Sequence, residues 1–239
     1  MDAKKFYDKT AHKYDARHEN NTIKHMQKFE KKFIVKHIKG KTLDIGCGTG
    51  RSLSLLNDAF GCDPSFEMLR IAKNKTNFPL VKCGAENLSF KDKSFDSVTC
   101  IFTVLNLCDY EIAAKEMNRV LKKGGVAVVS VASIWDKKYE NLLKRMLKEE
   151  KSTEINFRIE KTRLKFHLFS KKELVYVFEH NGFALKEFRG LFFLQKPYWG
   201  WYRPFTLTEK TKLFLENFLR TSKFNDAARM YLAAFENIS

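Results

Sequence analysis

The sequence lacks the features that mark membrane, secreted and metal-binding proteins. No segment reaches the roughly 18 consecutive apolar residues that a membrane-spanning helix needs. The first six residues contain none of the apolar core of a secretory signal. The five cysteines form no C-x-x-C pair and are odd in number, which argues against a metal site and a disulfide framework. These absences predict a cytoplasmic protein with free thiols and without a metal.

Acidic residues are few relative to basic ones. The chain has 28 Asp and Glu against 44 Lys and Arg, for a net charge of +16 and a pI near 9.6. A basic chain is compatible with a nucleic-acid partner. However, lysines outnumber arginines 33 to 11, and phosphate recognition favours the planar fork of arginine. Because lysine also serves solubility, the charge leaves RNA binding open.

The most informative stretch covers residues 43–51, LDIGCGTGR. An apolar segment contains one acid, Asp44, and runs into three alternating glycines. Glycine has no Cβ and tolerates positive φ, so a cofactor can lie against the bare backbone. The dinucleotide fingerprint G-x-G-x-x-G requires a third glycine where Arg51 stands, which disfavours NAD. The acid indicates a cofactor with a positive group, such as S-adenosylmethionine (SAM).

Apolar segments and helical patterns alternate along the first half of the chain. Strands are expected at 42–45, 59–62, 80–83, 95–102 and 126–132, and helices at 6–39 (two), 52–57, 66–72 and 110–121. The run 126–132 is apolar almost throughout, as in a parallel strand that is buried on both faces. This βα alternation predicts an α/β fold with a doubly wound, mostly parallel sheet.

The alternation breaks after Ser133. We expect a single domain, 1–239, with an N-terminal helical lid (1–40), a cofactor-binding core (41–133), a cap insertion (134–169) and a C-terminal half of the sheet (170–239). Ser170 and Glu173 predict a capping box for a helix at 171–180. Further expectations are a strand at 183–189, an aromatic loop at 191–206, a helix near 208–219 and a strand at 229–235.

Five segments in order resemble the class I SAM-dependent methyltransferases, especially the type 11 or UbiE-like group. They are 43–50, 61–63, 85–90, 94–98 and 119–125. The resemblance implies a Rossmann-like sheet of seven strands, with a final antiparallel strand beside the fifth. It also implies SAM as cofactor and S-adenosylhomocysteine as product.

The resemblance further implies roles for individual residues. Asp44 is expected to reach the ammonium group of SAM, directly or through water. Asp63 lies 19 positions further on, near the ~20 at which dinucleotide sheets place a ribose-binding acid. Ala85 and Glu86 fall at the adenine, although Gly84 stands where the family often has an acid. The expected cofactor contacts are Tyr14, Asp44, Gly46, Cys47, Gly48, Gly50, Asp63, Pro64, Ala85, Glu86 and Phe102.

The catalytic residues are less well indicated. Segment 103–109 is expected to border the methyl group, but it lacks the histidine that relatives commonly carry near Asn106. Asn106 and His167 are the two candidates, and for each a structural role is the simpler interpretation.

Three functions remain open. The first is an enzyme that methylates a small apolar or aromatic acceptor, suggested by the family and by the aromatic loop. The second is an RNA methyltransferase, suggested by the basic charge. The third is a SAM-binding protein without catalysis, suggested by Gly84 and the missing histidine.

Overall fold

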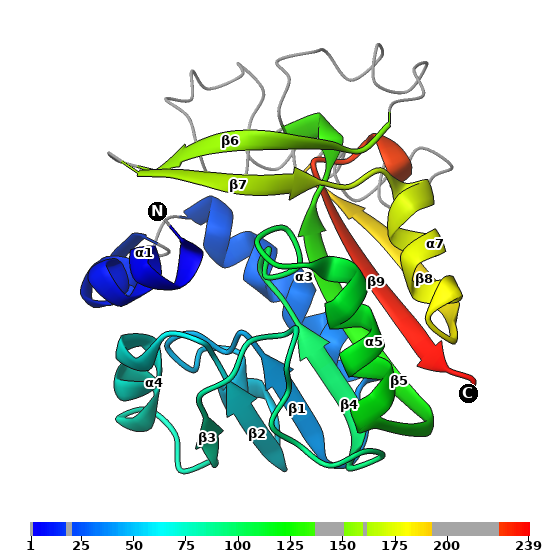
Figure 1. Cartoon of the computed structure of the whole chain (residues 1–239), viewed down its shortest axis with the longest axis horizontal. Helices are drawn as coiled ribbons and strands as arrows, with labels where there is room; N and C mark the ends of the chain where they lie inside the picture. The colour runs from blue at the N-terminus through cyan, green and yellow to red at the C-terminus, as the bar shows by residue number, and fades with distance from the viewer. Residues whose placement is uncertain (1, 18–20, 137–150, 160–161, 193–224) are drawn as a thin grey trace.

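The computed structural model describes residues 2–17, 21–136, 151–159, 162–192 and 225–239 (Figure 1). A seven-stranded sheet forms its centre, in the order β3-β2-β1-β4-β5-β9-β8. The parallel strands are β1 (Thr42–Ile45), β2 (Ala59–Cys62), β3 (Leu80–Val81), β4 (Phe95–Cys100) and β5 (Leu121–Ala132). Strand β9 (Met230–Asn237) is antiparallel to both of its neighbours, β5 and β8 (Phe183–Leu191). The predicted fold class is confirmed.

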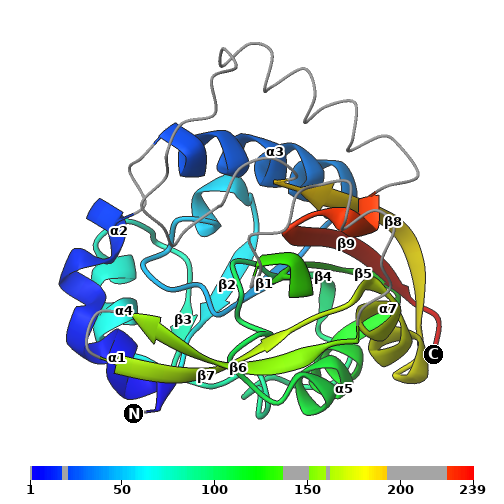
Figure 2. The same ribbon diagram turned by 90° about the horizontal axis from the view of Figure 1, so that it is seen from above.

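Helices cover both faces of the sheet, which explains its apolar strands. Helix α3 (Asn21–His37) packs on one face, and α5 (Tyr110–Val120) and α7 (Lys171–His180) pack on the other (Figure 2). Strand β5 is buried from Val126 to Ala132, as expected for a central strand between two helical layers. Because β1, β2 and β4 run parallel, their carboxyl ends lie at one common edge of the sheet.

Side-chain caps fix where the helices begin. Ser65 caps α4 (Phe66–Lys73), Asp109 caps α5 and Ser170 caps α7, each by accepting a backbone N–H from the first turn. The capping box expected at Ser170 is only half formed. The Ser170 N–H donates to Ser152 Oγ at 2.7 Å, while the Glu173 carboxylate binds other side chains.

Several sequence expectations need correction, and one is the strand expected at 95–102, which ends at Cys100. The segment expected to be a helix at 52–57 forms only a short 3-10 turn, η2 (Leu53–Leu55), in a segment that links β1 to β2. Strand β3 ends at Val81, before Cys83. Strand β5 begins at Leu121 directly after α5, so the Lys-Lys-Gly-Gly turn lies within the strand, where Gly124 adopts φ +72°.

The carboxyl edge of the sheet is covered by two elements from distant parts of the chain. Helices α1 (Ala3–Thr10) and α2 (Tyr14–Arg17) come from the N-terminus, and the hairpin of β6 (Thr153–Ile159) and β7 (Thr162–Leu168) comes from the cap insertion (Figure 1). They meet where Phe6 packs with Leu164. Most of the aromatic loop, the helix near 208–219 and residues 137–150 lie outside the described residues.

Within the described ranges, each helix is too short or too polar to span a bilayer.

Candidate cofactor and active site

A cavity of about 310 Å³ opens at the carboxyl ends of β1, β2 and β4. Ligands of open α/β sheets commonly bind at this edge. Its walls come from the N-terminal helices, the glycine loop, the end of β2, the β3–β4 loop and the segment after β4. The lining residues are Asp2, Ala3, Lys4, Tyr7, Tyr14, Gly46, Gly48, Asp63, Pro64, Ser65, Met68, Gly84, Ala85, Glu86, Ile101, Phe102, Val104, Leu107 and Cys108.

The glycine loop forms the floor of the cavity. Gly46 has φ +69° and Gly48 has φ +53°, a region that L side chains rarely adopt. A Cβ at Gly46 would lie 2.3 Å from Val104 Cγ2. A Cβ at Gly48 would meet no protein atom within 4 Å, so the backbone there faces open space. The loop therefore leaves a cradle in which a cofactor can approach the main chain closely.

Asp63 follows β2 and joins the floor to one wall of the cavity. Its Oδ2 accepts the Gly48 N–H at 2.9 Å, and its Oδ1 accepts the Ser65 N–H at 2.8 Å. Burial raises the pKa of this carboxyl to about 6. Because a carboxylate oxygen has two lone pairs, each oxygen can still accept a second bond. Asp63 is thus oriented to accept from a pair of ligand hydroxyls.

Asp44 does not line the cavity, and two side chains of the protein bind its carboxylate. Ser52 Oγ donates to its Oδ2 at 2.5 Å and Thr99 Oγ1 donates to its Oδ1 at 2.7 Å. Burial raises the pKa of this carboxyl to about 6 as well. Asp44 therefore ties the base of the glycine loop to β4. Cys47 and Gly50 also lie outside the cavity lining.

The β3–β4 loop forms a second wall through residues 84–86. Glu86 Oε1 accepts the Asp109 N–H at 3.2 Å. A Cβ at Gly84 would lie 3.0 Å from Glu86 Oε2. The carboxylate of Glu86 thus stands beside Gly84, in the space that a side chain at position 84 would enter.

The N-terminal helices close the cavity with Tyr7 and Tyr14. Asp8 Oδ1 accepts Ser65 Oγ at 2.7 Å, and Asp15 Oδ1 accepts Thr49 Oγ1 at 2.7 Å. Lys75 adds an ion pair to Asp15. These contacts hold the N-terminal helices against α4 and the glycine loop.

The turn after β4 holds two successive non-glycine residues in the left-handed region. Phe102 and Thr103 both have φ +68°, a strain that clusters at functional sites. Ser130 Oγ accepts the Phe102 N–H at 2.7 Å and itself donates to Glu30 at 3.1 Å. The Arg51 guanidinium lies 4.4 Å from the Phe102 ring centroid.

Sequence reasoning missed Glu30, which is only 3% exposed. Burial raises the pKa of its carboxyl to about 7. A signal was available, because Glu30 precedes Phe33 and Ile34 by three and four positions and so shares their buried helix face.

Asn106 and His167 do not line the cavity. Asn106 Nδ2 donates to Ala132 O at 3.0 Å and to His167 O at 2.5 Å, and its Oδ1 accepts the Ala132 N–H at 2.9 Å. His167 Nε2 lies 2.8 Å from Glu173 Oε2. Both side chains join β7 to neighbouring elements, which is a structural position.

The eleven residues predicted to contact the cofactor fall into two groups. Eight of them line the cavity, namely Tyr14, Gly46, Gly48, Asp63, Pro64, Ala85, Glu86 and Phe102. The other three, Asp44, Cys47 and Gly50, lie behind the floor and shape it.

Known proteins share both the sequence and the fold. Residues 43–129 match the family described as a methyltransferase domain. The chain is 47% identical over 156 residues to an uncharacterized protein of Methanocaldococcus jannaschii, covering 64% of this chain and 61% of that one. It is 42% identical over 125 residues to a demethylmenaquinone methyltransferase of Staphylococcus haemolyticus, covering 46% of this chain and 52% of that one. The matches thus span less than two thirds of these relatives.

A solved SAM-dependent methyltransferase of Thermotoga maritima has the same fold, with a TM-score of 0.66 and 23% identity over 98% of this chain and 99% of that one. The family match, the named relatives, the sheet order and the glycine cradle agree with the resemblance of the five sequence segments. Residues 43–129 of the chain therefore match a methyltransferase domain, and the chain has the fold of SAM-dependent methyltransferases.

Proposed function

We propose that this chain transfers the methyl group of SAM to an O, N or C nucleophile of a small apolar or aromatic acceptor. The observation that carries the proposal is the cavity, in which a bare glycine backbone and the Asp63 carboxylate adjoin a largely apolar wall. That wall contains Ile101, Phe102, Val104 and Leu107. Apolar walls with few polar groups are typical of sites for small organic ligands.

The cavity residues fit SAM in four places. Asp63 would accept from the ribose hydroxyls, and the Gly46 and Gly48 backbone would lie under the ribose and methionine part. Residues 84–86 would hold the adenine, and Tyr14 would close over the cofactor. SAM supplies the activated methyl group, so the chain contributes binding, orientation and electrostatics.

The placement of charge suits methyl transfer. The positive charge of the sulfonium disappears as the methyl group moves, so a carboxylate beside the sulfur would stabilise the ground state and slow the step. Of the carboxylates that line the cavity, Asp63 belongs to the β2 end, Glu86 to the β3–β4 loop and Asp2 to the start of the N-terminal helices. The lining residues from the segment after β4, including Phe102, Leu107 and Cys108, carry no carboxylate. This neutral segment faces the cavity where the acceptor is expected, and its apolar side chains exclude water.

The acceptor class rests on the apolar wall and on the relatives. One relative is named for demethylmenaquinone, and a quinone-like ring would suit walls of this kind. We further propose that the whole chain, 1–239, acts as one domain and that it is cytoplasmic, in keeping with its five free thiols.

An RNA substrate is the second candidate, supported by exposed cations beside the cavity. Lys4, Lys5 and Lys9 are exposed on α1, and Arg163 and Lys165 are exposed on β7. Such groups could contact phosphates on either side of the opening. RNA binding through them would weaken steeply as the salt concentration rises. Binding releases the cations condensed on the RNA, and added salt opposes that release.

One experiment separates these candidates. The protein is incubated with methyl-labelled SAM and, in parallel, with small-metabolite extract, lipid extract and total RNA from cells of the source organism. We expect label in the metabolite or lipid fraction. Label in RNA alone would assign the second candidate. Tight binding of SAM with label in no fraction would overturn the catalytic proposal and favour a SAM-binding protein without catalysis.

A further inference from the structure

The wall at residues 84–86 belongs to a loop without regular secondary structure between β3 and β4. Such a loop holds a defined shape only when other elements bind its backbone, because its own peptide groups form few mutual bonds. Within the loop, the Asn87 N–H donates to Gly84 O and the Phe90 N–H donates to Leu88 O. The shape of the wall therefore depends on what holds residues 86–94 from outside.

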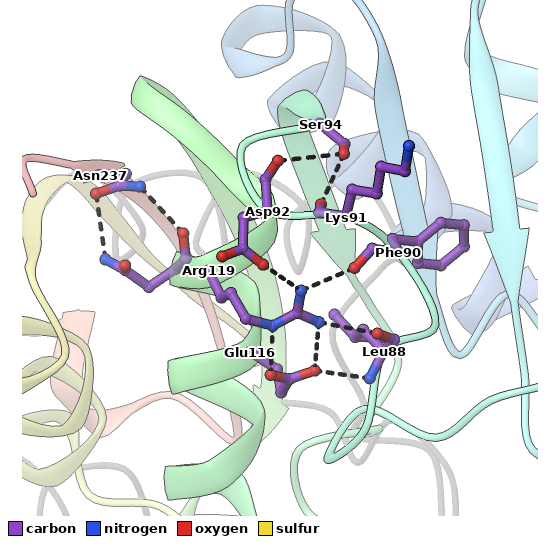
Figure 3. Close-up of polar contacts among 9 residues, drawn as sticks. Leu88, Phe90, Lys91, Asp92, Ser94, Glu116, Arg119 and Asn237 are labelled. Carbon is purple, nitrogen blue, oxygen red and sulfur yellow. Dashed lines mark hydrogen bonds and ion pairs between the residues drawn. The ribbon is translucent and has the colours of Figure 1, made fainter.

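Arg119, in the last turn of α5, binds this loop through its planar guanidinium. Nη2 donates to Leu88 O at 2.8 Å, and Nη1 donates to Phe90 O at 2.7 Å and to Asp92 Oδ1 at 2.8 Å (Figure 3). Two carbonyls and one carboxylate thus converge on one side chain. Lysine could not reproduce this arrangement, because it lacks the rigid fork.

Glu116, one turn earlier on α5, completes the contact. It accepts Arg119 Nε at 2.7 Å and Nη2 at 2.8 Å, and its Oε2 also accepts the Leu88 N–H at 2.7 Å (Figure 3). Both peptide groups of Leu88 are therefore held by one ion pair. An exposed ion pair by itself contributes about 0–1 kcal/mol, but this pair also satisfies the backbone of a buried residue.

Helix α5 holds the loop along its whole length. At the start of the helix, the Asp109 N–H donates to Glu86. At its end, the Lys93 N–H donates to Arg119 O at 2.9 Å and the Ser94 N–H donates to Val120 O at 2.8 Å. Helix α5 therefore binds residues 86–94 at both ends and in the middle. The wall of the cavity lies at the first of these contacts, at Glu86.

We infer that Arg119 and Glu116 are positioning residues for the cofactor, which hold the adenine-side wall in the shape that receives the nucleoside. The inference rests on the proposed function. Neither residue lines the cavity, so both act through the loop. They preorganise the wall, and without them binding must also order the loop.

The test compares Arg119→Ala and Glu116→Gln with the wild type by calorimetric titration. The probes are S-adenosylhomocysteine and 5′-methylthioadenosine, which lacks the amino-acid part. Arg119→Ala should weaken both probes by the same factor, about tenfold or roughly 1.4 kcal/mol, because the lost order lies at the nucleoside end. Glu116→Gln keeps an acceptor for Leu88, so the expected loss is about threefold.

Asn118→Ala is the matched control. Asn118 lies in the same turn of α5 but binds Gly182, Asn237 and Ser239 at the far side of the helix. It should lower the melting temperature while leaving both affinities within twofold.

The inference is overturned if a folded Arg119→Ala binds both probes as the wild type does, or if only S-adenosylhomocysteine is affected. If Arg119→Ala does not fold, an unchanged affinity in Glu116→Gln overturns it. A wild type that binds neither probe contradicts the proposed function itself, which is a different result.

Discussion

Replacing Asp63 with alanine is expected to weaken SAM binding by about 100-fold. A carboxylate that accepts from two ribose hydroxyls makes two charge-assisted bonds, each worth about 1.5–3 kcal/mol. The side chain is 8% exposed and is already oriented by the Gly48 and Ser65 amides, so little order is lost on binding. The loss is measured by titration with SAM or S-adenosylhomocysteine.

Two further variants serve as comparisons for Asp63→Ala. Asp63→Asn keeps one acceptor oxygen and should lose about tenfold, with an intermediate affinity. Asp58→Ala replaces an exposed acid before the opposite end of β2 and should bind as the wild type does. An Asp63→Ala protein that is folded and binds SAM with unchanged affinity would refute the role assigned to Asp63.

The affinity should also depend on pH through the same group. Because burial raises the pKa of Asp63 to about 6, the free protein holds a proton there below pH 6. A ligand that needs the ionised carboxylate must displace this proton, so the affinity falls as the pH drops below 6, by up to tenfold per pH unit. Titration between pH 5 and pH 8 should show this fall in the wild type and a weaker one in Asp63→Asn.

The second large effect is expected at Glu30, which controls how stability depends on pH. The pKa of its carboxyl rises from 4.5 to about 7 on folding, so the folded state binds the proton more tightly than the unfolded chain does. The stability that this group contributes is therefore fully present below pH 4.5 and is lost as the pH rises through 7. A shift of this size corresponds to about 3 kcal/mol.

Glu30→Gln removes this dependence and keeps a side chain that can bond to Ser130. Relative to the wild type, the variant should gain about 3 kcal/mol of unfolding free energy between pH 4.5 and pH 8. Urea unfolding at several pH values measures the difference, and contributions from Asp44 and Asp63 cancel because both proteins contain them. Glu67→Gln, at a half-buried position on α4 where the side chain pairs with Arg70, is the control. Parallel profiles for wild type and Glu30→Gln would contradict the effect assigned to Glu30.

The sequence allowed most of the fold to be predicted because its signals are local. Strands β1 and β2 were placed at their observed bounds, since each is a short apolar run between turns. Residues 52–57 were expected to be helical and form only a 3-10 turn, because a helix of that length has too few internal bonds to persist against loop packing. The hairpin of β6 and β7 was indicated only in part, by the alternation of apolar and polar residues at Ile155, Phe157 and Ile159 in the first strand.

The features of the candidate site also divide into those that the sequence predicted and those that it did not. The glycine spacing and Asp63 were readable because both depend on short stretches of chain. The bonds of Asp44 were not, since Thr99, which binds it, lies 55 residues away. The positions of Asn106 and His167 were equally hidden, because their partners belong to other strands and helices.

The sequence by itself determined the fold class, the resemblance to methyltransferases and the cofactor, because these depend on periodicity and on ordered short motifs. Only the tertiary structure decided which carboxylates face the cavity, which ones have a pKa raised by burial, and how α5 holds the β3–β4 loop. Glu30 acquires its proton affinity from burial, which outweighs the opposing effect of the hydrogen bond from Ser130, 100 residues away. Arg119 acquires its role from Leu88 and Phe90, which only the folded sheet brings within reach. Burial and long-range contact are properties of the packed chain, and no local pattern of residues encodes them.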